Sequence, residues 1–112
     1  FGHVADVVEG LSKTLETPAC FGQVINLGNN EETTIRELAE KAIEMTGSRS
    51  EIQYIPYEEA YGEGFEDMRR RVPSLEKAKR LLGFQPTRRL EDIINDVADQ
   101  FRRELKAESA NA

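Results

Sequence analysis

Stripes of apolar residues at helical spacing alternate along this chain with short continuous apolar runs, and this order limits the chain to a small set of folds. Apolar residues recur at helical spacing over residues 4–15, 35–45, 75–82 and 90–105, one stripe per helix. Two short apolar runs, at residues 24–27 and 52–55, lie between these helices. Each run is bounded by turn-forming residues, as a short strand would be. The sequence therefore predicts an α/β fold of about four helices and two short parallel strands. Because a two-stranded sheet is marginal alone, this order also predicts a missing companion part.

Local signals mark where several of these helices begin and end. Thr34 and Glu37 have the spacing of a capping box, and Gly47 is placed to close the same helix in a left-handed conformation. Ser74 is the expected N-cap of the next helix, and Gly83 is its expected end.

Length and composition indicate one small domain. The chain has 112 residues, no initiator Met and an immediate helical pattern, so we expect a piece of a longer protein. Residues 1–106 form the expected domain, and the small polar tail 107–112 is expected to fray. No apolar run approaches the length of a membrane span. The single Cys20 excludes an internal disulfide, which favours a reducing compartment, so a cytoplasmic location is expected. The formal net charge of −6 argues against nucleic acid as a partner.

The charges are strongly segregated along the chain. Residues 31–67 hold eleven acidic and three basic residues, whereas residues 69–89 hold eight basic residues and one acidic residue. A basic segment attracts anions, and the planar fork of arginine suits phosphate. Five of these bases are expected on solvated helix faces: Lys77, Lys79, Arg80, Arg88 and Arg89. The triplet 69–71 follows an irregular loop at 57–68, and it is either a phosphate contact or a solvated group.

The sequence contains no set of residues for metal binding or nucleophilic catalysis. A single Cys and a single His give no paired metal-ligand spacing, so no metal site is expected. Cys20 is expected to be a buried small hydrophobic residue, and His3 a helix-entry residue. Gly62 and Gly64 do not form a phosphate-binding loop, because they lie between no predicted strand and helix. We therefore predict no catalytic residue in this chain.

Four segments, in order, resemble the C-terminal substrate-binding part of the extended short-chain dehydrogenase/reductase family, whose members act on nucleotide sugars. They are FGHVADVV (1–8), VINLG with the following TIREL (24–28 and 34–38), RVPSLEKAK (71–79), and LGFQP with the final Leu90-Glu91 (82–91). The chain departs from the family pattern at His3, where Tyr is usual, and at Ser74, where Asp is commoner. Residues 61–73 look most like the UDP-glucuronate decarboxylase type and related epimerases. The resemblance covers nearly the whole chain.

The resemblance implies a role for two residues. It places Arg71 near the phosphates or sugar of a UDP-sugar substrate. It places Phe65 near the nucleotide base; the alternative is that Phe65 only packs its loop onto the core. Which sugar is bound, and whether the reaction is epimerisation, decarboxylation or dehydration, stay open.

The resemblance also implies an absent partner. In this family an N-terminal Rossmann half binds NAD through G-x-x-G-x-x-G and transfers protons through Y-x-x-x-K, and this chain contains neither motif. No cofactor is therefore expected on this piece, which is expected to be inactive alone, and the full-length enzyme is expected to be a homodimer. The alternative hypothesis is a stand-alone acidic module whose helices bind a protein partner.

Overall fold

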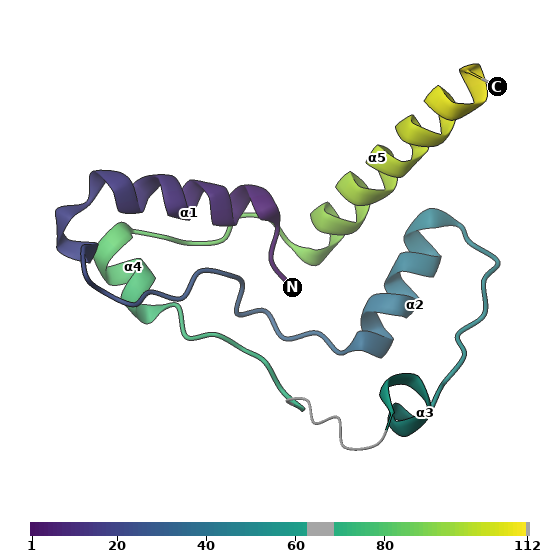
Figure 1. Ribbon diagram of the computed structural model, residues 1–112, viewed down its shortest axis with the longest axis horizontal. Helices are drawn as coiled ribbons and strands as arrows, with labels where there is room; N and C mark the ends of the chain where they lie inside the picture. Colours follow the sequence, from purple (N-terminus) through teal and green to yellow (C-terminus); the bar gives the residue numbers. More distant parts are fainter. Residues whose placement is uncertain (63–68, 112) are drawn as a thin grey trace. The chain divides into compact units, whose positions relative to one another are not determined.

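The computed structural model describes residues 1–62 and 69–111, which are helical or irregular. The elements are α1 (Val4–Glu16), the short 3-10 helix η1 (Pro18–Cys20), α2 (Ile35–Thr46), α3 (Tyr57–Tyr61), α4 (Glu76–Leu82) and α5 (Leu90–Ala110) (Figure 1). The chain divides into two compact units. The first unit comprises Phe1–Thr33 and Val72–Ala112, and the second unit is Thr34–Arg71.

The predicted α/β fold is wrong, because residues 1–62 and 69–111 contain no strand. Residues 24–27 and 52–55 are irregular. The exposure of their side chains shows why their apolar composition did not predict a strand. Val24 is 85% exposed and Tyr54 is 68% exposed, so neither segment is the buried strand that its composition indicated. A strand exists only with a hydrogen-bonded neighbour, and a local apolar run carries no information about such a neighbour.

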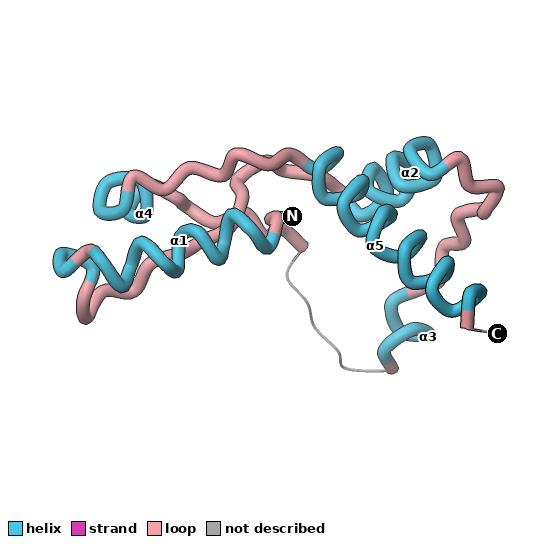
Figure 2. Tube along the Cα trace, turned by 90° about the horizontal axis from the view of Figure 1, so that it is seen from above, coloured by secondary structure: helices cyan, strands magenta, loops and turns pink. Residues whose placement is uncertain are grey.

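The core of the first unit lies where α1, η1 and α4 meet. Figure 2 shows α1 and α4 side by side. The buried cluster consists of Cys20, Leu75, Ala78, Leu82 and Phe84, with Ile25, Leu27 and Leu81 packed against it. Gly10 allows this close packing, since a Cβ atom there would lie 3.0 Å from side-chain atoms of both Leu27 and Phe84. The predicted burial of Cys20 is therefore confirmed.

The faces and ends of the helices in this unit differ in part from the sequence pattern. The apolar stripe of α1 is largely exposed, at Val4, Val8, Leu11 and Leu15, whereas Asp6 and Gly10 are buried. Leu75, and not Ser74, is the N-cap of α4, without a side-chain cap hydrogen bond. Gly83 closes α4 at φ 63°, as predicted. The last helix continues past Lys106 as far as Ala110.

In the second unit, α2 begins and ends where the sequence indicated. The hydroxyl of Thr34 accepts a hydrogen bond from the Glu37 N–H, and the Glu37 carboxylate accepts one from the Thr34 N–H. The backbone hydrogen bond from Thr34 is the main reason why the pKa of Glu37 is lowered. Gly47 ends the helix at φ 63°. The predicted capping box and C-terminal glycine are thus confirmed.

Replacing Thr34 with alanine is expected to destabilise the first turn of α2 by about 1 kcal/mol, the usual worth of an N-cap. The Glu37 N–H loses its acceptor, so its amide hydrogen should exchange faster, which NMR can measure. Thr46→Ala is the matched control, since that hydroxyl donates to the Ala42 carbonyl and caps no N–H group. Equal exchange of the Glu37 amide in both variants would show that the cap does not hold this turn.

Candidate functional site

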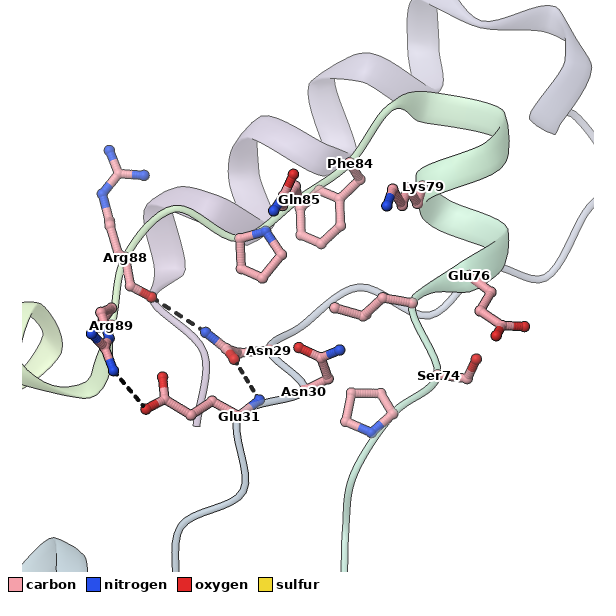
Figure 3. A pocket seen from close by; sticks show the side chains of 13 residues that line it. Asn29, Asn30, Glu31, Ser74, Glu76, Lys79, Phe84, Gln85, Arg88 and Arg89 are labelled. Carbon is pink, nitrogen blue, oxygen red and sulfur yellow. Dashed lines mark hydrogen bonds and ion pairs between the residues drawn. The ribbon is translucent and has the colours of Figure 1, made fainter.

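A cavity of about 570 Å³ lies within the first unit, and three segments of the chain line it (Figure 3). These segments are the turn at residues 29–31, the stretch from Pro73 to Glu76 with Lys79, and residues 84–86 with Arg88 and Arg89. Carboxylate, amide, hydroxyl and cationic groups stand in its wall beside two prolines and Phe84. This mixture suits a polar ligand more than a purely apolar one.

A buried carboxylate fixes one wall of this cavity. Asp6 is 2% exposed and accepts hydrogen bonds from the Thr87 hydroxyl at 3.1 Å, the Arg88 N–H at 3.1 Å and the Arg88 Nη1 at 2.7 Å. Burial by itself raises the pKa of Asp6, but the hydrogen bonds from Arg88 and Thr87 outweigh it, so the pKa is lowered. Asp6 is therefore ionised and ties the start of α1 to the segment before α5.

The same segment holds the turn at residues 29–31. The Asn29 Nδ2 donates to the Arg88 carbonyl at 3.3 Å, while the Asn29 Oδ1 accepts from the Glu31 N–H at 2.7 Å. Arg89 and Glu31 form an ion pair at 3.6 Å, which Figure 3 also marks. Arg88 is paired with Asp6, and Arg89 is paired with Glu31. Because their charges are compensated in this way, the two arginines contribute to the structure of the cavity wall more than to its positive charge.

Lys79 has a different electrostatic role from the two arginines. It extends from α4 into the cavity wall (Figure 3), and no ion pair involves it within residues 1–62 and 69–111. Its ammonium group is thus available to an anionic group of a ligand. Asn30 and Gln85 add amides that can donate or accept hydrogen bonds in the same cavity.

Arg71, one of the two residues that the family resemblance selected, does not line this cavity. Arg71 is exposed and forms the end of the second unit, two residues before Pro73, which lines the cavity. Phe65 lies outside the described residues, so its predicted role is not tested. Lys79 and Arg89 are exposed, as expected, whereas Arg88 is partly buried, and all three also line the cavity.

The sequence reasoning missed Asn29 and Asp6 as structural residues of the site. Asn29 sits in a turn signal of three residues, Gly28 to Asn30, which indicated a turn but not its contact with Arg88. Asp6 interacts with residues 81 and 82 positions away in the chain, and no local pattern reveals such a contact.

His3 and Cys20 have structural roles. The His3 Nδ1 accepts the Ala5 N–H at 3.0 Å, so His3 is the N-cap of α1, and its Nε2 contacts Asp96 at 2.6 Å. The predicted helix-entry role of His3 is confirmed. The buried Cys20 thiol donates to the carbonyls of Thr14 and Thr17.

Comparison with known proteins finds relatives of one kind, although no family model matches the chain. It is 38% identical over 111 residues to UDP-glucuronic acid decarboxylase 1 of Danio rerio, which covers 99% of this chain and 25% of that protein. It is 31% identical over 102 residues to UDP-N-acetyl-alpha-D-glucosaminuronate decarboxylase of Bacillus cytotoxicus, covering 91% of this chain and 32% of that protein.

The chain thus spans a quarter to a third of the length of these curated relatives. Both relatives are nucleotide-sugar decarboxylases by name, and the similarity extends over nearly all of this chain. The chain is therefore a homologue of nucleotide-sugar decarboxylases over part of their length, and the resemblance to the nucleotide-sugar epimerase/dehydratase family is confirmed. In the described residues, no helix has the length and apolar character needed to cross a membrane.

Proposed function

We propose that this chain is the substrate-binding part of an NAD-dependent nucleotide-sugar decarboxylase or epimerase. It holds a UDP-sugar while a Rossmann part of the same enzyme binds NAD and oxidises the sugar at C4. The observation that carries this proposal is the 38% identity, over 99% of the chain, to a protein named for UDP-glucuronic acid. The family resemblance further implies a cytoplasmic homodimer, and the chain alone is expected to be inactive.

The chemistry of two residues supports the proposal. The guanidinium of Arg71 offers two parallel N–H donors, which suit a phosphate oxygen pair, and it lies in a segment rich in basic residues. The aromatic ring of Phe65 provides a flat apolar face of the kind on which a nucleotide base stacks. We assign Arg71 to the phosphates or sugar, and Phe65 to the base.

The exposed apolar residues of α1 support a companion part. Val4, Val8, Leu11 and Leu15 recur on one stripe of the helix and are 53–81% exposed. An apolar stripe of this extent on a soluble protein usually contacts another protein surface. A stand-alone interaction module, the alternative function, would instead start near residue 1 and carry its own complete core. Sequencing the reading frame upstream of the Phe1 codon separates the two hypotheses.

Replacing Arg71 with alanine in the full-length protein is expected to weaken UDP-glucuronate binding about tenfold or more. A lost charge-assisted hydrogen bond is worth about 1.5–3 kcal/mol, which corresponds to a change of this size. Arg80→Ala on α4 is the matched control, because it removes the same charge from the same basic segment. Calorimetric titration gives both dissociation constants. Small and equal changes in the two variants would refute the role assigned to Arg71.

A further inference from the structure

The first turn of α1 is capped by the ring of His3, whose two nitrogens make different contacts. The Nδ1 atom accepts a hydrogen bond from the Ala5 N–H at 3.0 Å. A backbone N–H group can only donate, so Nδ1 carries no proton. The Nε2 atom lies 2.6 Å from the Asp96 carboxylate, which accepts, so the proton of the ring is on Nε2. The two contacts together require the neutral imidazole in this one tautomer.

Protonation of this ring is incompatible with the cap. An imidazolium carries a proton on both nitrogens, so its Nδ1–H would point at the Ala5 N–H. The added positive charge would also lie at the N-terminus of α1, where the helix dipole disfavours cations. Both effects act in the same direction, and the Ala5 N–H loses its acceptor.

The contact with Asp96 compensates for this loss only in part. The Asp96 side chain is 63% exposed, whereas the His3 side chain is 12% exposed. An ion pair with an exposed partner is worth little, and less than the usual cost of losing an N-cap. Protonation therefore strengthens the contact with Asp96 but leaves a net loss at the first turn of α1.

The other charged groups around this ring largely compensate one another. Asp6 of α1 is paired with Arg88 of the segment before α5. From α5, Arg103 and Glu104 carry opposite charges and line the same cavity of about 680 Å³ as the ring. Asp96 is thus the charged group that a protonated ring meets, and the cavity gives the ring access to protons from solvent.

We propose that His3 is a pH-sensitive cap of α1. The neutral ring holds the first turn of the helix through the Ala5 N–H. As the pH falls through the range in which histidine becomes protonated, the ring leaves Ala5, pairs with Asp96 and releases that turn. The same turn contains Val4, the first residue of the exposed apolar stripe of α1. Acidification therefore loosens the N-terminal end of this stripe.

Hydrogen exchange of the Ala5 amide tests the proposal in the protein expressed from its complete reading frame. Protection is measured relative to an unstructured peptide at the same pH, which removes the ordinary pH dependence of exchange. We expect the Ala5 amide to lose about fivefold of its protection between about pH 8 and pH 5, as the loss of an N-cap would cause. The Glu37 amide is the internal control, because its acceptor is the Thr34 hydroxyl, which does not titrate in this range.

Two variants separate the ring from other effects of acid. His3→Asn retains a side chain that can cap the helix but does not titrate, so the protection of Ala5 should stay constant with pH. Asp96→Asn removes the charge that attracts the imidazolium, so the loss of protection should move to lower pH. A loss that does not move in Asp96→Asn would overturn the pairing with Asp96 and, with it, the proposal.

Constant protection of Ala5 in the wild type would overturn the proposal, whether or not the variants fold. An equal loss in His3→Asn, or at the Glu37 amide, would also overturn it, since the loss would then not depend on the ring. Nitrogen NMR at about pH 8, with the His3 signal identified by its absence from His3→Asn, should show the proton on Nε2; a proton on Nδ1 would contradict the proposal. None of these residues is assigned to the substrate, so titration with UDP-glucuronate tests the proposed function separately.

Discussion

Replacing Phe84 with alanine is expected to lower the free energy of unfolding of the first unit by about 3–5 kcal/mol. The Phe84 ring is 3% exposed and belongs to the cluster that joins α1, η1 and α4. Its edge lies 3.0 Å from the position that a Cβ atom on Gly10 would take, so the helix backbone approaches it closely. Truncation leaves a cavity that neither the helix backbone nor Leu27 can fill without moving.

Phe101→Ala provides the matched control for this prediction. It removes the same atoms from α5, but Phe101 is 60% exposed, so the loss should stay within about 0.5 kcal/mol. Urea titration followed by circular dichroism gives both values, and amide exchange in α4 assigns the loss to the first unit. Similar losses in the two variants would contradict the location of the core.

The second large effect is expected for Asp6→Ala, at about 3 kcal/mol. The substitution removes the acceptor of three hydrogen bonds and leaves the Arg88 guanidinium without its partner. The Arg88 side chain is 38% exposed, so solvent compensates part of its charge once Asp6 is removed. The expected loss of unfolding free energy is therefore at the lower end of the range measured when one partner of a buried ion pair is removed. Asp99→Ala is the control, because the Asp99 carboxylate is exposed and forms an exposed ion pair with Arg102 three residues away.

The lowered pKa of Asp6 predicts a pH dependence of stability that the variant Asp6→Asn should lose. The pKa is lowered in the folded protein, so the folded state favours the ionised carboxylate more than the unfolded state does. That stabilisation is complete above the ordinary carboxyl range and disappears as the pH falls through the lowered pKa. Stability measured between pH 7 and acid should therefore fall more steeply in the wild type than in Asp6→Asn. Parallel curves would show that folding does not lower the pKa of Asp6.

Most of the helices were predictable from the sequence, because the signals that fix their ends are local; α3 (Tyr57–Tyr61) was not, since it lies in the stretch 57–68 that was expected to be irregular. Thr34 and Glu37 are three residues apart, and each satisfies a backbone group of the other. Gly83 ends α4 because it adopts a left-handed conformation that other residues rarely adopt. The strands were not predictable, since Val24 and Tyr54 have the composition of strand residues without a partner to pair with.

The candidate site was predictable only in part. The concentration of bases in residues 69–89 indicated an anion site, and the family motif selected Arg71 from it. The position of Arg88 in the cavity wall depends on the hydrogen bond that it donates to Asp6 and the one that its carbonyl accepts from Asn29, which join segments distant in sequence. Such contacts follow from tertiary packing, which no local pattern in the sequence reveals. For the same reason, the apolar stripe of α1 did not predict that Asp6 and Gly10 are the buried residues of this helix.

The most direct test of the central claim is a titration of UDP-glucuronate into the protein expressed from its complete reading frame, with NAD present. A substrate-binding part of a nucleotide-sugar enzyme predicts saturable binding that UDP competes away and that Arg71→Ala weakens about tenfold or more. A folded protein that binds neither UDP-glucuronate nor UDP at millimolar concentration would contradict the account.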